Sequence, residues 1–369
     1  MKKAYKFRIY PTKAQEEQIQ KTFNCCRFIY NYYLSKRKEV YETAGETFSY
    51  FDCANDMTKL KQDKQWLREA DSQALVYTIR YLDVAYKNFF HRVKKGETPG
   101  YPKYKSKYNA HNSYTTMQKS IRLSDKHINL PKLGLVKCVI SNNVEGRIVS
   151  VTVCQNPSGK YFVSILTEIE ASIPQNTLNK DNAIGLDYSS PHFYVDSNGN
   201  AANMPHYYHD AELRLKREQR KLSKMTFGSN NYQKQKTKVA RIYERVQNSR
   251  NDWQNKERRK LAERYDIVCV EDINYQSLSQ TLNIAKATYD NAFGTFRKML
   301  SYKLEQRGKK LIVIDKWFPS SKMCRHCGYI NHKLELKDRQ WVCPQCNQVI
   351  LRDENAAINI KLEGLTMLA

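Results

Sequence analysis

The hydrophobic pattern of this chain changes its period twice, and each change limits what the following residues can form. Apolar residues recur at steps of three and four from Ile19 to Phe89, as in amphipathic helices, whereas apolar and polar residues alternate from Ser113 to about residue 173, as in strands. After Ala183, short apolar runs alternate with long helical patterns, which is typical of an α/β domain. At 369 residues the chain is longer than one ordinary core requires, so we expect two or three structural units.

A further strand pattern, at residues 3–10, precedes the helical block. Pro11 ends it, and Thr12 with Gln15 has the spacing of a capping box that begins a helix. We expect residues 3–10 to be the first strand of a small antiparallel barrel or sheet that continues at 113–173, with the helices inserted between the two parts. The predicted fold class is therefore α+β with several domains.

The formal net charge is +25, from 62 Lys and Arg against 37 Asp and Glu. An excess of this size is neutralised by a polyanion, so nucleic acid is the expected partner. An acidic membrane surface is the alternative, but it usually requires a lone basic amphipathic helix or a lipid anchor, and here the excess runs along the whole chain. Basic residues are densest from Glu212 to Arg264, which favours a phosphate-binding surface over a merely solvated helical face.

The hydrophobic pattern of the sequence shows no targeting signal. No stretch approaches 18 consecutive apolar residues, and the start, MKKAYKFRIYP, has neither an apolar h-region nor a small-residue cleavage site. We therefore expect a soluble cytoplasmic protein without a membrane partner.

Four of the ten cysteines lie close together near the end of the chain: Cys324, Cys327, Cys343 and Cys346. Two residues separate the members of each pair and fifteen separate the pairs, which is the spacing of two zinc knuckles. Four thiolates complete a tetrahedral shell, so we predict one structural Zn²⁺, although His326 and His332 are nearby alternatives. The remaining cysteines are scattered, which fits a reducing compartment.

Three acidic residues lie at the edges of elements predicted for the α/β domain. Asp187 follows the apolar run AIGL, Glu271 follows DIVCV, and Asp353 opens the helical pattern DENAAINI. Strand ends on one side of such a sheet converge, and three carboxylates there would repel one another unless divalent cations lay between them. Two Mg²⁺ ions held in this way can activate a water and stabilise the leaving oxygen of a phosphodiester. Each acid alone is explained by a strand-end turn or a helix cap, but together, in a basic chain, they favour a metal site.

The motifs of the chain resemble, in order and over essentially its whole length, those of the TnpB (OrfB) family encoded by bacterial insertion sequences. The matching segments are KFRIYPT, CCRFIYNYYL, AYKNFF, GYPKYKSK, LPKLG, GLDYSS, VEDI, WFPSSKMCRHCG, CPQC and RDENAAINI. The resemblance implies an RNA-guided DNA endonuclease with a RuvC-like, RNase H-fold nuclease domain, related to the type V CRISPR effectors. Its partners would be a guide RNA from the transposon end and double-stranded target DNA. We expect a monomer in the bacterial cytoplasm, associated with the nucleoid when bound to DNA, and leave the oligomeric state open.

Carried over residue by residue, the resemblance assigns both metal sites. Asp187, Glu271 and Asp353 match the catalytic triad that holds two Mg²⁺ ions, and the four clustered cysteines match the zinc finger. The implied domains are a wedge β-barrel at 1–10 and 111–177, a helical recognition lobe at 11–110, a RuvC-like nuclease at 178–320 and 350–369, and a zinc finger, or ribbon, inserted at 321–349.

The resemblance also implies a surface that reads a short DNA motif beside the target. The matching positions are Tyr50, Ser72, Gln73 and Val76, where hydroxyl and amide groups could contact base edges and Val76 could contact a thymine methyl. The alternatives are that Tyr50 packs under the helices and that Ser72 is an N-cap.

Two departures and two rival functions accompany the resemblance. Tyr188, Ser189, Ser190 and Pro191 stand where many relatives have a Gly and a Lys after the first acid, and the chain stops soon after the last acidic helix, at Ala369. One rival is a guide-RNA-dependent DNA-binding regulator that never cuts, against which the three intact acids count. The other is a strand-exchange transposase, for which an HUH motif with a nucleophilic Tyr would be expected and is not found.

Overall fold

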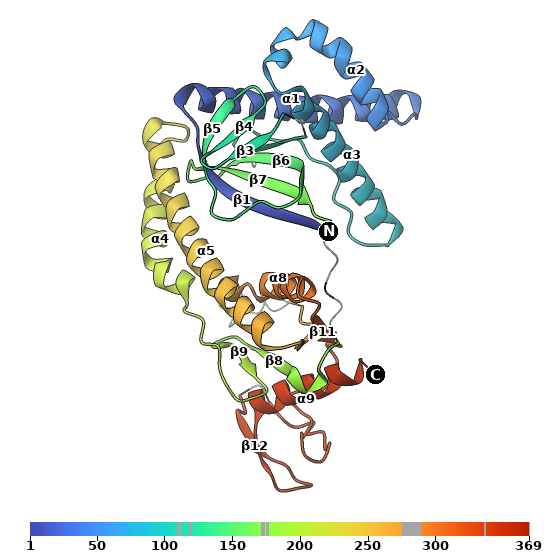
Figure 1. The fold of residues 1–369 in the computed structure, drawn as a ribbon, viewed down its shortest axis with the longest axis vertical. Coiled ribbons are helices and arrows are strands. Elements are labelled where there is room, and N and C mark those ends of the chain that lie inside the picture. The colour runs from blue at the N-terminus through green and yellow to red at the C-terminus, as the bar shows by residue number, and fades with distance from the viewer. Residues whose placement is uncertain are drawn as a thin grey trace. The chain divides into compact units, whose positions relative to one another are not determined.

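The computed structural model describes residues 1–108, 112–117, 120–170, 174, 177–274, 289–335 and 337–368. The chain divides into two compact units, Met1–Ala171 and Ser172–Ala369. Figure 1 shows their elements in chain order by colour. The expected lobe boundary at 110 and 111, and the expected end of the sheet near 173, lie outside the described residues. Among the described residues, no helix is both long and apolar enough to cross a membrane.

In the described residues of the first unit, the helical part consists of three α-helices and a short 3₁₀ helix. They are α1 (Lys13–Ala44), α2 (Tyr50–Asp63), η1 (Gln65–Glu69) and α3 (Ser72–Lys94). The predicted capping box at Thr12 and Gln15 is confirmed, and Ser49 with Asp52 forms a second one at the start of α2. The apolar stripe of α1, which includes Ile19, is buried in the core of the unit.

The sheet of the first unit contains seven antiparallel strands in the part of the chain that the structure describes. They are β1 (Lys2–Tyr10), β2 (Asn112–Thr116), β3 (Arg122–Ser124), β4 (His127–Leu130), β5 (Gly134–Val139), β6 (Arg147–Gln155) and β7 (Tyr161–Glu168), in the order β2-β6-β7-β1-β5-β4-β3. The prediction that the N-terminal strand joins this sheet is confirmed, because β1 pairs with both β7 and β5. Tyr5, Phe7 and Ile9 alternate into the core shared with the helices.

Among the described strands the sheet of the first unit is open, whereas a closed barrel was one of the two structures expected from the sequence. Among the described strands, β2 and β3 stand at the two ends of the order and do not pair with each other. The hydrogen bonds of the described strands therefore form a sheet with two edges and not a continuous barrel ladder.

The second unit is built around a four-stranded mixed sheet. Its strands are β8 (Ala183–Ser189), β9 (Phe193–Asp196), β10 (Ile267–Glu271) and β11 (Lys310–Ile314), in the order β11-β10-β8-β9. Strands β8, β10 and β11 are parallel, and β9 runs antiparallel to β8. A 3₁₀ helix, η2 (Lys180–Asn182), leads into β8.

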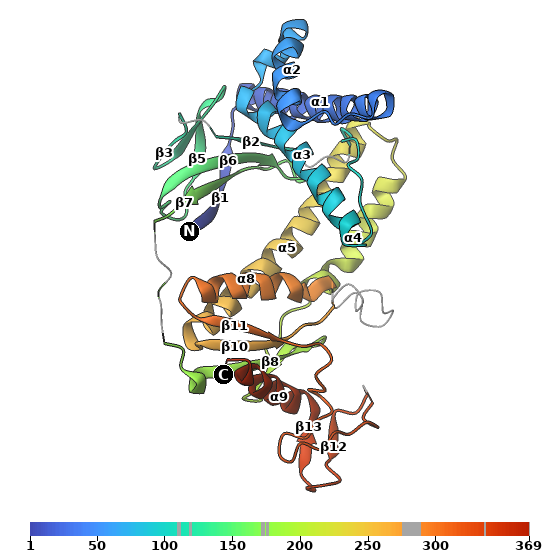
Figure 2. The same cartoon turned by 90° about the vertical axis from the view of Figure 1, so that its right-hand side faces the viewer.

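Helices cover both faces of this sheet. They are α5 (Asn230–Arg264), α8 (Phe293–Glu305) and α9 (Arg352–Thr366), while α4 (Tyr207–Ser223) packs against α5. One apolar cluster joins the sheet to α5 and α8, and a second joins the opposite face, through Cys269 and Ile312, to Ile360 of α9. Figure 2 shows α8 and α9 on opposite sides of the strands. The predicted α/β alternation is confirmed, and the predicted helical stretch at 207–264 consists of α4 and α5.

A small antiparallel hairpin precedes α9. Its strands are β12 (Gln340–Val342) and β13 (Val349–Leu351), with Trp341 opposite Ile350. These two side chains pack with Cys324 and Cys343 in a core of their own. The hairpin and the cysteine loops therefore form a separate small cluster at the start of α9.

Candidate functional site

The register of the central strands places two of the predicted acids side by side. Parallel β8 and β10 pair Gly185 with Cys269 and Leu186 with Val270, so the next residues, Asp187 and Glu271, are neighbours at the carboxyl ends of adjacent strands. Successive side chains alternate between the faces of a strand, so Asp187 lies on the face of Gly185 and Glu271 on the face of Cys269.

Helix α9 lies directly against that face because the contacting residues are small. A Cβ atom on Gly185 would overlap the carbonyl oxygen of Ala357, and one on Gly364 would lie 2.5 Å from Sγ of Cys269. Asp353 stands four residues, about one helical turn, before Ala357 and therefore on the same side of α9. The third acid thus comes to the end of the sheet where Asp187 and Glu271 lie.

The pKa of Asp187 reflects its burial and the charges of the other two carboxyl groups. Burial, followed by the charges of Asp353 and Glu271, raises the pKa of Asp187 well above its ordinary value. Burial also raises the pKa of Glu271 to about 7. Positive charge among such carboxyl groups would relieve the repulsion that opposes their ionisation. Their oxygen atoms are the ligands that Mg²⁺ prefers, so the donor set fits that ion.

Two arginines supply positive charge beside the third acid. The Arg339 Nη1 atom lies 3.3 Å from Oδ2 of Asp353, and the Arg352 Nε atom lies 3.2 Å from Oδ1. The charges of both arginines also lower the pKa of Asp187, against the stronger effects that raise it. The sequence analysis missed this pairing. Arg352 adjoins Asp353 in the sequence, but Arg339 reaches it only through the hairpin.

The turn after the first acid, where the sequence analysis noted a departure from the family pattern, is held by the buried Asn291. Asn291 Nδ2 donates to the carbonyl oxygen of Ser190 at 3.0 Å and to the Tyr188 hydroxyl at 3.3 Å. The carbonyl of Asn291 in turn accepts from Gln254 of α5 at 2.6 Å. The Tyr188 ring also packs edge-on against Phe293 of α8, at 5.1 Å between centroids. The unusual residues therefore form an ordered turn, whose partners the sequence analysis did not foresee.

The four clustered cysteines converge on one point. Their sulfur atoms all lie within 4.8 Å of one another, with Cys324 and Cys346 separated by 3.7 Å and Cys327 and Cys343 by 3.5 Å. Among the described residues, this is the one group of three or more His, Cys, Asp or Glu side chains whose ligand atoms already lie this close together. Asp187, Glu271 and Asp353 do not form so compact a group. His326 and His332, the alternatives considered from the sequence, are not part of the group. A closed four-sulfur site is the geometry of a structural zinc.

The two cysteine pairs lie on loops with the same backbone pattern. Cys324 N–H donates to Tyr329 O and Gly328 N–H donates to Cys324 O; Cys343 N–H donates to Gln348 O and Asn347 N–H donates to Cys343 O. Gly328 and Asn347 both have positive φ angles, of 76° and 57°, a conformation that Gly and Asn tolerate best. Burial opposes ionisation of Cys343, but the backbone N–H groups of Cys346 and Gln345 lower its pKa to about 7. Amides directed at sulfur in this way favour the thiolate that a metal requires.

Two buried asparagines connect this cysteine cluster to α9. Asn355 Nδ2 donates to Met323 O at 2.7 Å while its Oδ1 accepts from the backbone N–H of Arg325 at 3.0 Å. Asn359, one turn later, donates to the carbonyl oxygens of Ser320 and Met323 at 2.8 and 2.7 Å. The sequence analysis missed these residues. Two Asn four apart within an apolar helical pattern were the available signal, because Asn is a poor interior helix residue unless its side chain is bonded.

The four residues predicted to read a DNA motif lie around the packing of α2 against α3. Ser72 and Gln73 are exposed, whereas Tyr50 and Val76 are half-buried against the core of the unit. The alternative that Ser72 is an N-cap is wrong, because Asp71 caps α3 by accepting from Gln73 N–H at 3.1 Å. The Ser72 hydroxyl accepts from Lys61 Nζ at 3.4 Å instead.

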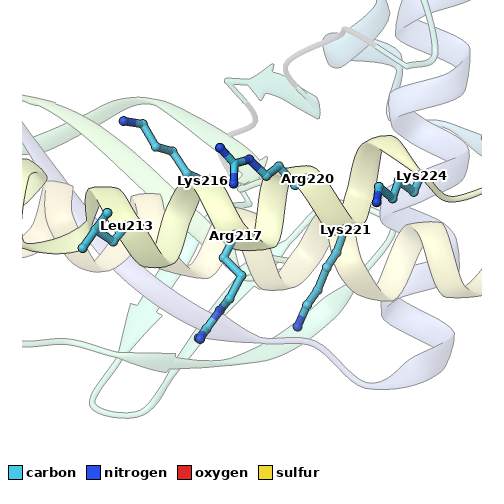
Figure 3. A pocket seen from close by; sticks show the side chains of 6 residues that line it. All are labelled: Leu213, Lys216, Arg217, Arg220, Lys221 and Lys224. Carbon is cyan, nitrogen blue, oxygen red and sulfur yellow. The ribbon is translucent and has the colours of Figure 1, made fainter.

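One face of α4 carries a row of basic side chains. Figure 3 shows them around a shallow cavity of about 420 Å³, which is lined by Leu213, Lys216, Arg217, Arg220, Lys221 and Lys224. Beneath them Glu218 is buried, and its hydrogen bonds with Gln235 and Lys238 of α5 lower its pKa to about 2. Glu218 therefore holds α4 to α5 and remains charged.

Comparison with known proteins places the chain in a family. It is 32% identical over 371 residues to a Streptomyces pristinaespiralis protein named "Putative RNA-guided DNA endonuclease", covering 99% of this chain and 90% of that protein. Residues 164–282 match the OrfB family model described as "Probable transposase". The chain belongs to the TnpB family.

Further matches of this TnpB chain span its remaining parts. Residues 1–46 match a "Helix-turn-helix domain" model of OrfB proteins, and residues 293–360 match the "Cas12f1-like, TNB domain" model. The Escherichia coli K12 protein "Putative RNA-guided DNA endonuclease InsQ" is 27% identical, over 99% of this chain and 93% of its own length. The fold is similar to that of the protein in "Cryo-EM structure of the Cas12f1-sgRNA-target DNA complex", with a TM-score of 0.54, 13% identity and 98% coverage of both chains.

Proposed function

We propose that this TnpB protein is an RNA-guided DNA endonuclease. The observation that carries the proposal is the convergence of Asp187, Glu271 and Asp353, from two strands and a helix, at one end of the second unit's sheet. Its relatives over nearly full length bear the name of this activity. The four-stranded sheet, with its parallel centre and antiparallel β9, is the framework we assign to a RuvC-like, RNase H-fold nuclease.

The three carboxylates would hold two Mg²⁺ ions. When bound, such ions activate a water for attack on the phosphodiester and stabilise the departing oxygen. The role of the chain is to hold three anionic oxygens on one face by the close contact of Gly185 and Gly364 with their neighbours. Arg339 and Arg352, which pair with Asp353, are placed to balance charge as ions and a DNA phosphate arrive.

The four cysteines would hold one structural Zn²⁺, in the zinc finger that the sequence predicts at 321–349. With four sulfur ligands no position is left for water, so the ion would stabilise the loops and take no part in hydrolysis. Through Asn355 and Asn359, a rigid cysteine cluster would fix the first turns of α9 and so the position of Asp353.

Nucleic acid would be bound by separate surfaces with separate roles. The basic row on α4 suits the phosphates of a guide RNA, while Tyr50, Ser72, Gln73 and Val76 would read a short DNA motif beside the target. Base pairing with the guide would read the rest of the target, as in other RNA-guided effectors. We assign residues 1–10 and 111–177 to a wedge domain and the helices between them to a recognition lobe, and we place the activity in the bacterial cytoplasm, at the nucleoid.

The test combines identification of the RNA with a cleavage assay. RNA that copurifies with the protein is sequenced, and its guide segment is matched to a plasmid target flanked by a randomised motif. We expect cleavage only with guide RNA and Mg²⁺, at targets that share one motif, and none after chelation of the metal. Guide-dependent binding without cleavage in Mg²⁺ would instead support the rival regulator.

A further inference from the structure

A cavity of about 510 Å³ lies within the first unit. It is formed by the end of α1, the residues that join α1 to α2, the second half of α3, and Tyr101. Cavities that bind small ligands generally measure about 300–1,000 Å³, so it can hold a ligand the size of a nucleoside. Its lining does not include Tyr50, Ser72, Gln73 or Val76, so it is separate from the proposed motif reader.

Aromatic rings form much of its wall. Phe89 packs edge-to-face against Phe90 and Tyr101, at 5.1 and 5.2 Å between centroids, and Tyr86 packs in the same way against Tyr101 at 5.6 Å. The rim is open to solvent, because Tyr41 is 66% exposed and Phe90 is 56% exposed. Exposed aromatic rings at the rim of such an opening can accept a flat ligand by stacking.

Side chains that can donate hydrogen bonds and side chains that can accept them both lie beside these rings. The buried Arg37 guanidinium lies 5.2 Å from the centroid of the Tyr86 ring and pairs with Asp83 at 3.3 Å, while its Nε finds no acceptor in the structure. Lys38 Nζ lies 5.7 Å from the Tyr101 centroid. The carboxylates of Glu42 and Glu46 also line the cavity. With Lys87, three cationic side chains and three carboxylates therefore line the same cavity, so a ligand that offers both donors and acceptors suits it better than a purely apolar one.

We propose that this cavity binds one unpaired nucleobase. A base has a π-face for the rings and an edge with both hydrogen-bond donors and acceptors, which is the combination that the walls offer. Purines are favoured because they give the larger stacking area. The proposal rests on the proposed function only in taking nucleic acid as the partner. The base comes from one of two sources, the guide RNA or the DNA strand displaced from the target.

The test uses the full-length chain and single-stranded oligoadenylates, ribose or deoxyribose, that contain one 2-aminopurine. Stacking quenches the fluorescence of this base, so the readout requires neither cleavage nor a metal. Replacing both rim rings, Tyr41→Ala with Phe90→Ala, should weaken binding by about 5- to 150-fold and abolish the quenching. Both rings are exposed, so the fold should survive. Tyr41→Phe with Phe90→Tyr keeps two rings and should restore both readouts.

The matched control is Phe51→Ala, which removes a ring that is 73% exposed on α2, outside the cavity. If the rim double variant loses binding and quenching only with the ribose probe, the base comes from the guide RNA. If it loses them with the deoxyribose probe, the base comes from the displaced strand. The proposal is overturned if the rim double variant binds and quenches both probes as the control does, or if the unaltered protein quenches neither. A protein that passes this test but never cuts DNA would disprove the nuclease and leave the base site standing.

Discussion

The cysteine cluster and the acidic cluster are both candidate metal sites in the second unit, but they are built in opposite ways. The cysteines come from two loops within 23 consecutive residues, each with the same backbone hydrogen bonds, and their sulfur atoms already lie within 4.8 Å. The acids come from positions 187, 271 and 353, lie at one end of the sheet because α9 packs tightly on β8 and β10, and are less closely grouped than the cysteines. One site depends on local chain geometry and the other on the packing of the whole unit. They should therefore fail under different perturbations.

The largest expected effect is on catalysis, from Asp187→Ala. Loss of a metal ligand should remove several kcal/mol of transition-state stabilisation, which slows cleavage about 10²- to 10⁴-fold. Guide RNA and target binding should persist, and the zinc content should be unchanged. Stability without Mg²⁺ should not fall, because one of three repelling carboxyl groups is gone. Cleavage at the normal rate by this variant would refute the assignment.

Removal of a zinc ligand should disturb the cysteine cluster directly and the acids only indirectly. Cys343→Ser should lose the ion and loosen the loops at 320–325 that Asn355 and Asn359 hold. Cleavage should then fall although no acid has changed. Elemental analysis and limited proteolysis measure the two effects. Cys138→Ser, at a buried cysteine in the first unit, is the control that should keep one zinc per chain; full zinc in Cys343→Ser would contradict the four-sulfur site.

A methyl group between β8 and α9 should disturb the acids without touching the cysteines. Gly185→Ala overlaps the backbone of α9 and should destabilise the second unit by about 1–3 kcal/mol, with reduced cleavage and retained zinc. Denaturant unfolding measures the change. Gly100→Ala is the matched control, since its new Cβ would lie 3.6 Å from Arg92 in ordinary contact. Equal stability of the two variants would show that α9 does not pack on β8 as described.

The last expected effect concerns the dependence of stability on pH. In the folded state burial raises the pKa of Glu271 to about 7, so between its ordinary value and 7 the folded chain binds more protons than the unfolded chain. Without Mg²⁺, stability should therefore decline as pH rises from about 4.5 to about 7. Glu271→Gln should flatten that decline, as judged by denaturant midpoints across this range. Saturating Mg²⁺ should also flatten the decline, because the ion favours the carboxylate. If stability fell equally with pH in the unaltered chain, in the chain with Mg²⁺ and in Glu271→Gln, Glu271 would be excluded as the source of the decline.

Local patterns in the sequence were sufficient for much of the fold and for the residue types of both sites. Three such patterns depend on residues that lie near one another in the sequence. They are the capping box at Thr12, the change from helix to strand periods, and the cysteine spacing. The physical constraints that shape them are local too, namely backbone hydrogen bonds and chelate geometry. The three acids were proposed as a site because each stands near the end of an element.

The tertiary structure alone decided how these parts meet. It placed β1 between β7 and β5, left β2 and β3 as sheet edges among the described strands, and gave the cap of α3 to Asp71. It also paired Arg339 with Asp353 and set Asn355 and Asn359 against the cysteine loops. Residues such as Gly185 and Gly364 carry no pattern of their own. Their effect arises because a missing side chain lets a helix and a strand approach, and which surfaces approach is decided only when the whole unit packs.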